Sequence, residues 1–329
     1  MADAAALARE VQGFVDGCTA LERAVARAVV GQRDTVDHVI TALLAGGHVL
    51  LEGAPGLGKT LLVRSLAEAV DLSFSRVQFT PDLMPADITG TNIVVDDPKA
   101  GRTFRFSPGP LFANLVLADE INRTTPKTQS ALLEAMQEGV VTVSGTSHPL
   151  PEPFMVLATQ NPIDMEGTYP LPEAQLDRFL MKVMVPFPTA AELASVLDLT
   201  TGTASGRVEK ALTKETLRTY RALVRDVVLA PNVRDLAVKI TLATHPSDPA
   251  APQGVRKYVR HGASPRGAQA LVACAKVRAL RAGRAHVESA DVKAVALPAL
   301  RHRLILNFEG EAEGLSTDRI VSEVLAATS

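Results

Sequence analysis

The octapeptide from Gly53 to Thr60, Gly-Ala-Pro-Gly-Leu-Gly-Lys-Thr, limits most strongly what this chain can fold into. It is a complete G-x-x-x-x-G-K-T pattern, whose glycines allow positive φ and let backbone N–H groups approach phosphate oxygens. The helix after such a loop directs its positive end at the same anion. In this pattern Lys59 binds the β- and γ-phosphates, and the Thr60 hydroxyl ligates Mg²⁺. The sequence therefore predicts a phosphate-binding loop between a strand and a helix.

Short apolar runs alternate with helical patterns around this loop, up to about residue 188. The runs are too short for helices and predict buried strands at His48–Glu52, Ser73–Gln78, Leu115–Ala118, Phe154–Thr159 and Leu180–Val185. Helices are expected at Met1–Val30, Arg33–Ala45, Lys59–Val70, Thr125–Glu138 and Glu173–Arg178. Strands that alternate with helices predict an α/β fold with a parallel sheet.

Two stretches interrupt this alternation. Thr91–Val95 and Arg102–Phe106 are β-prone, and turn-forming residues at 96–101 separate them, which predicts a hairpin within about 90–110. A second excursion is expected over about 140–153.

From residue 189 onward the patterns are helical, apart from a Pro/Gly-rich loop expected over Pro246–His261. The expected helices are Ala190–Leu199, Lys214–Val227, Val233–Ala243, Ser264–Ala282 and Glu288–Leu297. A length of 329 residues accommodates two domains. We therefore expect an α/β core over 1–188 and a helical domain over 189–329.

Two carboxylates, Asp119 and Glu120, follow a predicted buried strand. Placing charged groups at the end of a buried strand costs free energy unless another group interacts with their charge. Downstream of a phosphate-binding loop, Asp119 is expected to hold the Mg²⁺ shell and Glu120 to polarise the attacking water. Asn161 follows another predicted strand, where its amide either positions that water or forms a turn before Pro162.

Composition excludes several classes of protein. No apolar run reaches the roughly 18 residues that a membrane span needs, and the N-terminus lacks the basic start of a secretory signal. A net charge of −2, the absence of tryptophan and 4% aromatic residues disfavour nucleic-acid binding. Cys18 and Cys274 match no metal or redox spacing, so we expect two buried thiols rather than a bridge. These features together predict a cytoplasmic protein.

In their order along the chain, these motifs resemble those of AAA+ ATPases, and more narrowly those of the MoxR family of bacterial and archaeal proteins. The resemblance rests on Gly53–Thr60, Ala118–Arg123, Leu132–Glu138, Ala158–Pro162, Leu171–Phe179, Ala263–Arg266 and Leu300–Arg303. It covers about Val30 to the C-terminus. It implies an AAA+ P-loop NTPase core with a parallel sheet, followed by an all-helical lid domain. The segments 90–110 and 140–153 match the helix-2 insert and the hairpin before sensor 1.

The resemblance also implies roles for single residues. Gly31 and Gln32 match positions that line the adenine pocket, and Asn161 matches sensor 1. Arg178 matches an arginine finger that completes a neighbouring subunit's site, and Arg266 matches sensor 2 of the lid. The implied ATP- or ADP-binding residues are Gly31, Gln32, Gly53, Ala54, Pro55, Gly56, Leu57, Gly58, Lys59, Thr60, Leu61, Asp119 and Arg266, with Mg²⁺ on Thr60 and Asp119.

Without the resemblance, the sequence does not decide the role of either Arg178 or Arg266. Arg178 beside Asp177 is also consistent with a surface salt bridge of little energetic value. Ser264 is a good N-cap and Pro265 a good first helical residue, so Arg266 falls in a first helical turn. A cation there opposes the helix dipole, which favours an external anion beside it; the alternative is a solvated surface arginine.

The resemblance implies an ATP-hydrolysing machine that assembles into a ring, most commonly a hexamer, and remodels a partner protein. Family partners often carry von Willebrand factor A domains or belong to maturing metal-cofactor complexes. Three alternatives are the ATPase subunit of a metal chelatase, a nucleic-acid motor, and a nucleotide-binding scaffold without turnover. The motif Leu171–Phe179 disfavours the chelatase, and the slightly acidic balance disfavours the motor. The joint presence of Glu120, Asn161 and Arg178 disfavours the scaffold.

Overall fold

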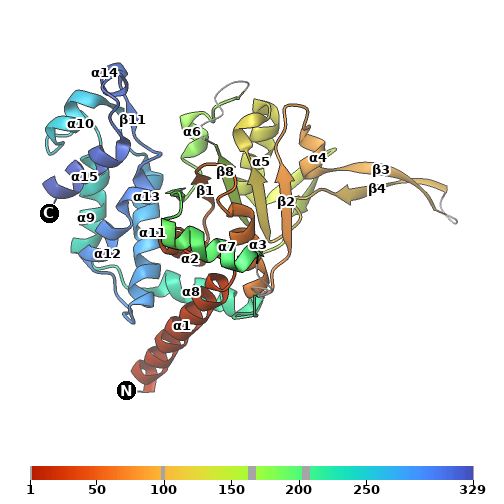
Figure 1. Cartoon of the computed structure of the whole chain (residues 1–329), viewed down its shortest axis with the longest axis horizontal. Helices are drawn as coiled ribbons and strands as arrows, with labels where there is room; N and C mark the ends of the chain where they lie inside the picture. Colours follow the sequence, from red (N-terminus) through yellow and green to blue (C-terminus); the bar gives the residue numbers. More distant parts are fainter. Residues whose placement is uncertain (1, 98–100, 162–167, 202–207, 329) are drawn as a thin grey trace.

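A computed structural model describes residues 2–97, 101–161, 168–201 and 208–328 of the chain. Within these residues a five-stranded sheet has the order β2-β5-β8-β1-β9, and each neighbouring pair of strands runs parallel (Figure 1). Its strands are β1 (Val49–Glu52), β2 (Phe74–Gln78), β5 (Leu115–Asp119), β8 (Met155–Gln160) and β9 (Met181–Met184). The predicted α/β fold with a parallel sheet is confirmed.

Alternation along the central strands divides the core between the two faces of the sheet. Val49, Leu51 and Leu117 belong to one buried cluster, whereas Leu50 and Val116 belong to the other. Both faces are covered, which is why these strands are apolar runs rather than alternating ones. The first cluster continues without a break into the C-terminal helices, so the helical part packs on one face of the sheet.

Helices and two hairpins complete the N-terminal part. Its helices are α1 (Ala2–Ala26), α2 (Arg33–Ala45), α3 (Lys59–Ala69), α4 (Pro85–Thr89), α5 (Pro126–Glu138) and α6 (Glu173–Leu176), with a 3₁₀ turn at Ile121–Arg123. Strands β3 (Gly90–Asp97) and β4 (Gly101–Pro108) form an antiparallel hairpin that projects far from the body (Figure 1). Strands β6 (Val140–Val143) and β7 (Thr146–Pro149) form a second, shorter one. Positions 98–100 of the turn expected at 96–101 lie outside the described residues.

The C-terminal part is helical, as predicted, with one addition. Its helices are α7 (Ala190–Thr201), α8 (Lys214–Asp226), α9 (Pro231–Leu242), α10 (Gln253–Tyr258), α11 (Pro265–Arg281), α12 (Ser289–Ala294), α13 (Ala296–Leu300), α14 (Phe308–Ala312) and α15 (Thr317–Ala327). The addition is a small antiparallel sheet of β10 (Val259–His261) and β11 (Ile305–Leu306), which an all-helical domain would lack.

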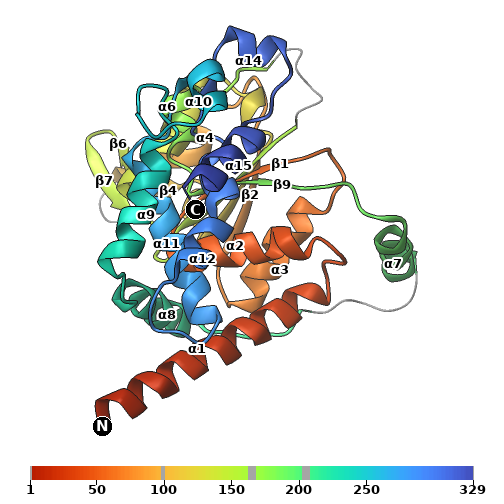
Figure 2. The same cartoon turned by 90° about the vertical axis from the view of Figure 1, so that its left-hand side faces the viewer.

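Helix α7 stands apart from the other C-terminal helices, as the turned view shows (Figure 2). It has no buried residue, and it lies instead beside the loop that follows β1. Helix α11 contacts α8, α9, α12 and α13 of the C-terminal part, and α1 and α2 of the N-terminal part. The division at residue 188 stays a prediction.

Two expectations about loops and thiols have different outcomes. The Pro/Gly-rich stretch Pro246–His261 is not only loop, because it contains α10 and β10. Cys18 and Cys274 are buried and unpaired, as expected, and burial raises the pKa of each thiol to about 12. Among the described helices, none has the length and apolar character that crossing a membrane requires.

Candidate nucleotide-binding and hydrolysis site

The loop between β1 and α3 has the backbone geometry that its glycines permit. Gly56 and Gly58 have φ of 80° and 75°, in the left-handed region that glycine adopts without strain. A Cβ on either residue would meet no described atom within 4 Å, so this face of the loop is open. A Cβ on Gly53 would instead lie 2.8 Å from the carbonyl oxygen of Val185. The first residue of the loop therefore packs against the residue that follows β9. The glycines further along the loop lie on an open face.

Lys59 is the first residue of α3, and its ammonium group lies over the loop. Its Nζ donates hydrogen bonds to the carbonyl oxygens of Gly53 at 2.7 Å and Ala54 at 2.9 Å. Burial lowers the pKa of Lys59, and the negative charges of Asp119 and Glu120 oppose that shift. The cation is thus within electrostatic range of both acids, at the positive end of a helix. This arrangement suits binding of a polyphosphate.

Asp119 ends β5, and hydrogen bonds engage both of its carboxylate oxygens. Oδ1 accepts a 2.6 Å bond from the Thr159 hydroxyl, which lies on the adjacent strand β8. Oδ2 accepts a 2.7 Å bond from Nη2 of Arg76, on the other neighbouring strand, β2. Carboxylate oxygens are ligands that Mg²⁺ prefers, and a hydrogen bond such as that from Thr159 fixes their orientation. Asp119 therefore fits a magnesium ligand, with Arg76 as a competing cation.

Glu120 adopts a left-handed backbone conformation with φ of 57°. Its N–H donates to the Thr159 hydroxyl at 2.8 Å. Its Oε2 accepts hydrogen bonds from Gln78 at 2.7 Å and from Arg123 at 3.0 Å. An L-residue rarely holds this conformation without support, and here the surrounding contacts provide it. The carboxylate stays partly exposed, as a group that polarises water must be.

Asn161 is buried directly after β8, the strand that lies between β1 and β5. It is therefore next to both the strand that leads into the loop and the strand that ends in the acids. Sequence reasoning did not identify Arg76, Gln78 or Thr159 as site residues. The signal that could have identified the first two is the alternation of side chains along β2. Arg76 and Gln78 lie two residues apart and therefore share one face of this edge strand, and Gln78 pairs in register with Asp119.

An apolar pocket of about 400 Å³ lies beside the loop. Its lining combines the segment before α2, the loop itself and helix α7: Ala28, Val29, Val30, Gln32, Pro55, Gly56, Leu57, Gly58, Leu61, Phe187, Pro188, Leu193, Val196, Leu199 and Thr200. A pocket of this size and character is typical of a small-molecule site. Gly31 and Gln32, expected at an adenine pocket, and Leu61, expected among the nucleotide-binding residues, thus lie at or beside this hollow.

Gln32 supplies a test of whether adenine fits there. Its Nε2 donates to the Leu57 carbonyl at 2.8 Å, whereas its Oε1 is buried without a partner among the described residues. A buried acceptor without a hydrogen bond is costly, and an exocyclic amino group is the donor it lacks. Glu192 of α7 accepts a hydrogen bond from the Gln32 backbone, which joins this helix to the pocket. The pocket and the loop together fit Mg·ATP.

Arg178 lies elsewhere, just before β9 begins, whereas the phosphate-binding loop follows the end of β1. The two strands run parallel, so these points are at opposite ends of the strand pair. Arg178 donates from Nη1 to the Leu133 carbonyl at 2.6 Å. Its neighbour Asp177 does not pair with it but binds Arg303 at 2.9 Å. Arg178 is therefore not brought to the loop of its own chain.

Arg266 lies beside Asp177 as well. Ser264 caps α11 by accepting from the Arg266 N–H at 3.1 Å, so the arginine falls in the first helical turn, as the sequence indicates. The anion beside its guanidinium is Asp177, whose Oδ2 is 3.8 Å from Nη1. Arg266 does not line the pocket beside the phosphate-binding loop. The two arginines thus share one region, separate from their own chain's loop.

Comparison with known proteins agrees with this geometry. Residues 48–181 match the family described as "ATPase family associated with various cellular activities (AAA)", and residues 253–324 match the AAA lid domain. The Mycobacterium tuberculosis protein named Chaperone MoxR1 is 41% identical over 95% of this chain and 83% of its own length. Protein MoxR of Methylorubrum extorquens is 32% identical over 88% of both chains.

A solved structure extends the agreement to the whole fold. A candidate ATPase from Cytophaga hutchinsonii superposes with a TM-score of 0.92 at 38% identity, over 99% of this chain and 98% of the other. Identity at this level over nearly complete chains establishes common family membership. The chain belongs to the MoxR family of AAA+ ATPases.

Proposed function

We propose that this protein hydrolyses ATP to ADP and phosphate in a Mg²⁺-dependent reaction. Loop residues and Lys59 bind the phosphates, Thr60 and Asp119 hold the metal, and Glu120 polarises the attacking water. The carrying observation is that Lys59, after β1, lies within electrostatic range of Asp119 and Glu120 at the end of β5, across the intervening strand β8. When bound, Mg²⁺ supplies charge neutralisation for the transferring phosphoryl group. Asn161, next to both strand ends, positions the water.

We further propose that the active site is shared between subunits of a ring, most simply a hexamer. Arg178 and Arg266 lie near the start of β9 rather than at their own phosphate-binding loop. A subunit that offers both arginines to the next subunit's nucleotide explains this placement. A guanidinium supplied in trans stabilises charge on the transferring phosphoryl group. A head-to-tail contact forms a ring when successive rotations between subunits add up to a full turn.

The work done by hydrolysis is, in this proposal, the remodelling or maturation of partner proteins. The name of the relative Chaperone MoxR1 supports a chaperone-like role. Proteins with von Willebrand factor A domains and metal-cofactor complexes are the partners that the family resemblance suggests. A cytoplasmic location completes the proposal, and the two buried, unpaired cysteines are consistent with a reducing compartment.

Steady-state ATP hydrolysis, measured per subunit against protein concentration, tests the proposal. The wild type should show a rate that rises with concentration as rings form and that vanishes with EDTA. Glu120→Gln should lower kcat by about 100-fold or more while ATP still binds, because general-base catalysis contributes that much. Glu311→Gln, an exposed glutamate on α14, serves as the matched control and should behave as wild type. Wild-type turnover in Glu120→Gln, or no turnover of the wild type at any concentration, contradicts the proposal.

A further inference from the structure

A second pocket, of about 570 Å³, lies between α8, α9, α11 and the C-terminal end of α2. It shares no residue with the pocket beside the phosphate-binding loop. Small apolar side chains form much of its wall, and four cationic residues line it: Arg221, Arg225, Arg234 and Lys276. No acidic residue is among the described residues that line it. We call this hollow the basic pocket.

Arg221 is the deepest of these cations. Its Nε donates to the Leu43 carbonyl at 2.8 Å, but its Nη2 is buried and has no partner in the described part of the chain. Burial, with the positive charge of Arg225 nearby, lowers the pKa of Arg221 to about 10, and Glu152 opposes this shift only in part. A buried guanidinium nitrogen without an acceptor is energetically costly.

The other cations leave the charge of the pocket largely uncompensated. The Arg225 guanidinium is exposed and has no hydrogen bond or ion pair with any described residue. Lys276 donates to the Arg225 carbonyl at 2.6 Å, and burial lowers its pKa although the negative charge of Asp226 opposes that shift. Arg234 alone has an ion pair, with Asp235 at 2.8 Å on the surface. The pocket therefore concentrates positive charge over an apolar wall.

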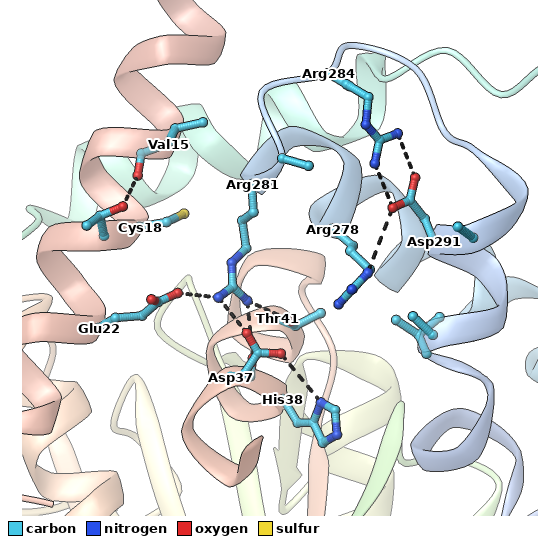
Figure 3. A pocket seen from close by; sticks show the side chains of 15 residues that line it. Val15, Cys18, Glu22, Asp37, His38, Thr41, Arg278, Arg281, Arg284 and Asp291 are labelled. Atoms are coloured by element: carbon cyan, nitrogen blue, oxygen red, sulfur yellow. Dashed lines mark hydrogen bonds and ion pairs between the residues drawn. The ribbon is translucent and has the colours of Figure 1, made fainter. Parts of the chain in front are cut away.

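A neighbouring pocket shows how the same protein neutralises buried arginines. This pocket of about 460 Å³ lies between α1, α2, α11 and α12, and Figure 3 shows its charged side chains. There Arg281 binds Glu22 and Asp37, which overcome the effect of burial and raise its pKa. Arg284 binds Asp291 at 2.8 Å in the same way. The basic pocket has cations without these acids, which points to an anion from outside the chain.

We propose that the basic pocket binds an anionic small molecule that carries a phosphate group on an apolar body. Arginine favours phosphate through paired N–H donors, and Arg221 and Arg225 lie on one face of α8, four residues apart. A volume of about 570 Å³ suits a ligand of this size. A further pocket of about 580 Å³ shares Gly46, Arg221 and Arg225 with it, and Glu138 and Glu152 line that second pocket as well. The proposal does not depend on ATP hydrolysis.

Isothermal titration calorimetry with octyl phosphate, below its micelle concentration, tests this proposal on the full chain. The wild type should bind one equivalent, and neutral octyl glucoside should not bind. Arg225→Gln should weaken octyl phosphate binding roughly tenfold or more, as loss of a charged hydrogen bond does. Arg225 and Lys276 have solvent-exposed or partly exposed side chains, so Arg225→Gln and Lys276→Gln should fold even where Arg221→Gln does not.

Arg319→Gln is the matched control, because Arg319 is an exposed arginine on α15 outside the basic pocket. It should bind octyl phosphate as tightly as the wild type. Absence of binding to the wild type, or equal weakening in Arg225→Gln and Arg319→Gln, overturns the proposal. Sodium phosphate and octanoate distinguish the parts of the ligand. Equal affinity for sodium phosphate overturns the apolar half of the proposal, and equal affinity for octanoate overturns the phosphate half.

Discussion

The Asp177 carboxylate accepts a 2.9 Å hydrogen bond from Nε of Arg303, across 126 residues of chain. The same carboxylate accepts from the hydroxyl of Ser264, the N-cap of α11. Asp177 directly precedes Arg178, so these contacts tie the segment carrying Arg178 to the helical part of the chain. The Arg303 side chain is 2% exposed, which makes Asp177 its essential counter-charge.

Replacing Asp177 should therefore destabilise the fold. Asp177→Asn keeps the shape of the side chain but leaves the Arg303 charge buried and unpaired. We expect the free energy of unfolding to fall by about 3 kcal/mol, the scale for breaking a buried ion pair from one side. Urea denaturation followed by circular dichroism measures it. Asp235→Asn, which breaks the exposed pair with Arg234, should cost less than about 1 kcal/mol, and equal losses in the two variants would refute the role of Asp177.

Gln32 should set the preference for adenine. Gln32→Ala removes the buried Oε1 that lacks a hydrogen-bond donor, so we expect the Kd for ATP to rise about tenfold. The preference for ATP over GTP should shrink by a similar factor, because guanine offers an acceptor where adenine offers the amino group. Competition binding with the two nucleotides measures both effects. Gln137→Ala, at an exposed position on α5, should leave the preference unchanged; an unchanged preference in Gln32→Ala would contradict the assignment.

Arg76 should compete with the metal for Asp119. Arg76→Gln removes a cation 2.7 Å from Oδ2, so half-maximal hydrolysis should need at least about threefold less Mg²⁺. Charges this close near a protein surface interact by on the order of 1 kcal/mol or more. A Mg²⁺ titration of steady-state ATPase activity measures the shift. Arg64→Gln on α3, which carries an exposed arginine, is the control. A higher Mg²⁺ requirement in Arg76→Gln would show that Arg76 supports the metal instead.

His302 should make stability depend on pH. Burial and the charge of Arg303 hold the pKa of His302 well below its usual value of about 6.5. As pH falls through 6.5 the unfolded chain binds this proton first, so stability is lost below that pH, by up to about 1.4 kcal/mol per pH unit. His302→Gln keeps a donor for the Phe179 carbonyl and does not titrate. Urea denaturation between pH 7 and 5 should show a smaller loss for His302→Gln, and identical slopes would contradict this.

The parts of this fold that local sequence encodes were predictable. The strand–loop–helix around Lys59 follows from glycine and lysine spacing, and the buried strands follow from short apolar runs. Helix α10 was missed because its sequence, Gln253–Tyr258, contains a glycine and follows a proline. Its contacts with α15 stabilise it, and a Cβ on Gly254 would meet Glu323 there. Tertiary packing thus overrides a weak local propensity.

The site residues were predictable only where they lie within one continuous segment of the sequence. Asp119 and Glu120 stand out at a strand end. Arg76, the partner of Asp119, lies 43 residues away, on a strand whose position in the sheet no local pattern specifies. The same holds for Asp177 and Arg303, which the fold alone brings together. Sequence identifies a charged residue readily, whereas its counter-charge depends on topology.

Restoration of activity by mixing two inactive variants tests the shared site most directly. Lys59→Ala should lose phosphate binding, and Arg178→Ala should lose the arginine offered to the neighbour; each alone should be almost inactive. The two variants, co-expressed with different tags and purified through both, form mixed rings in which some subunits combine an intact loop with an intact neighbouring arginine. We predict about a quarter of the wild-type rate for random mixing in a closed ring. Doubly purified assemblies no more active than either variant alone would contradict a site shared between subunits.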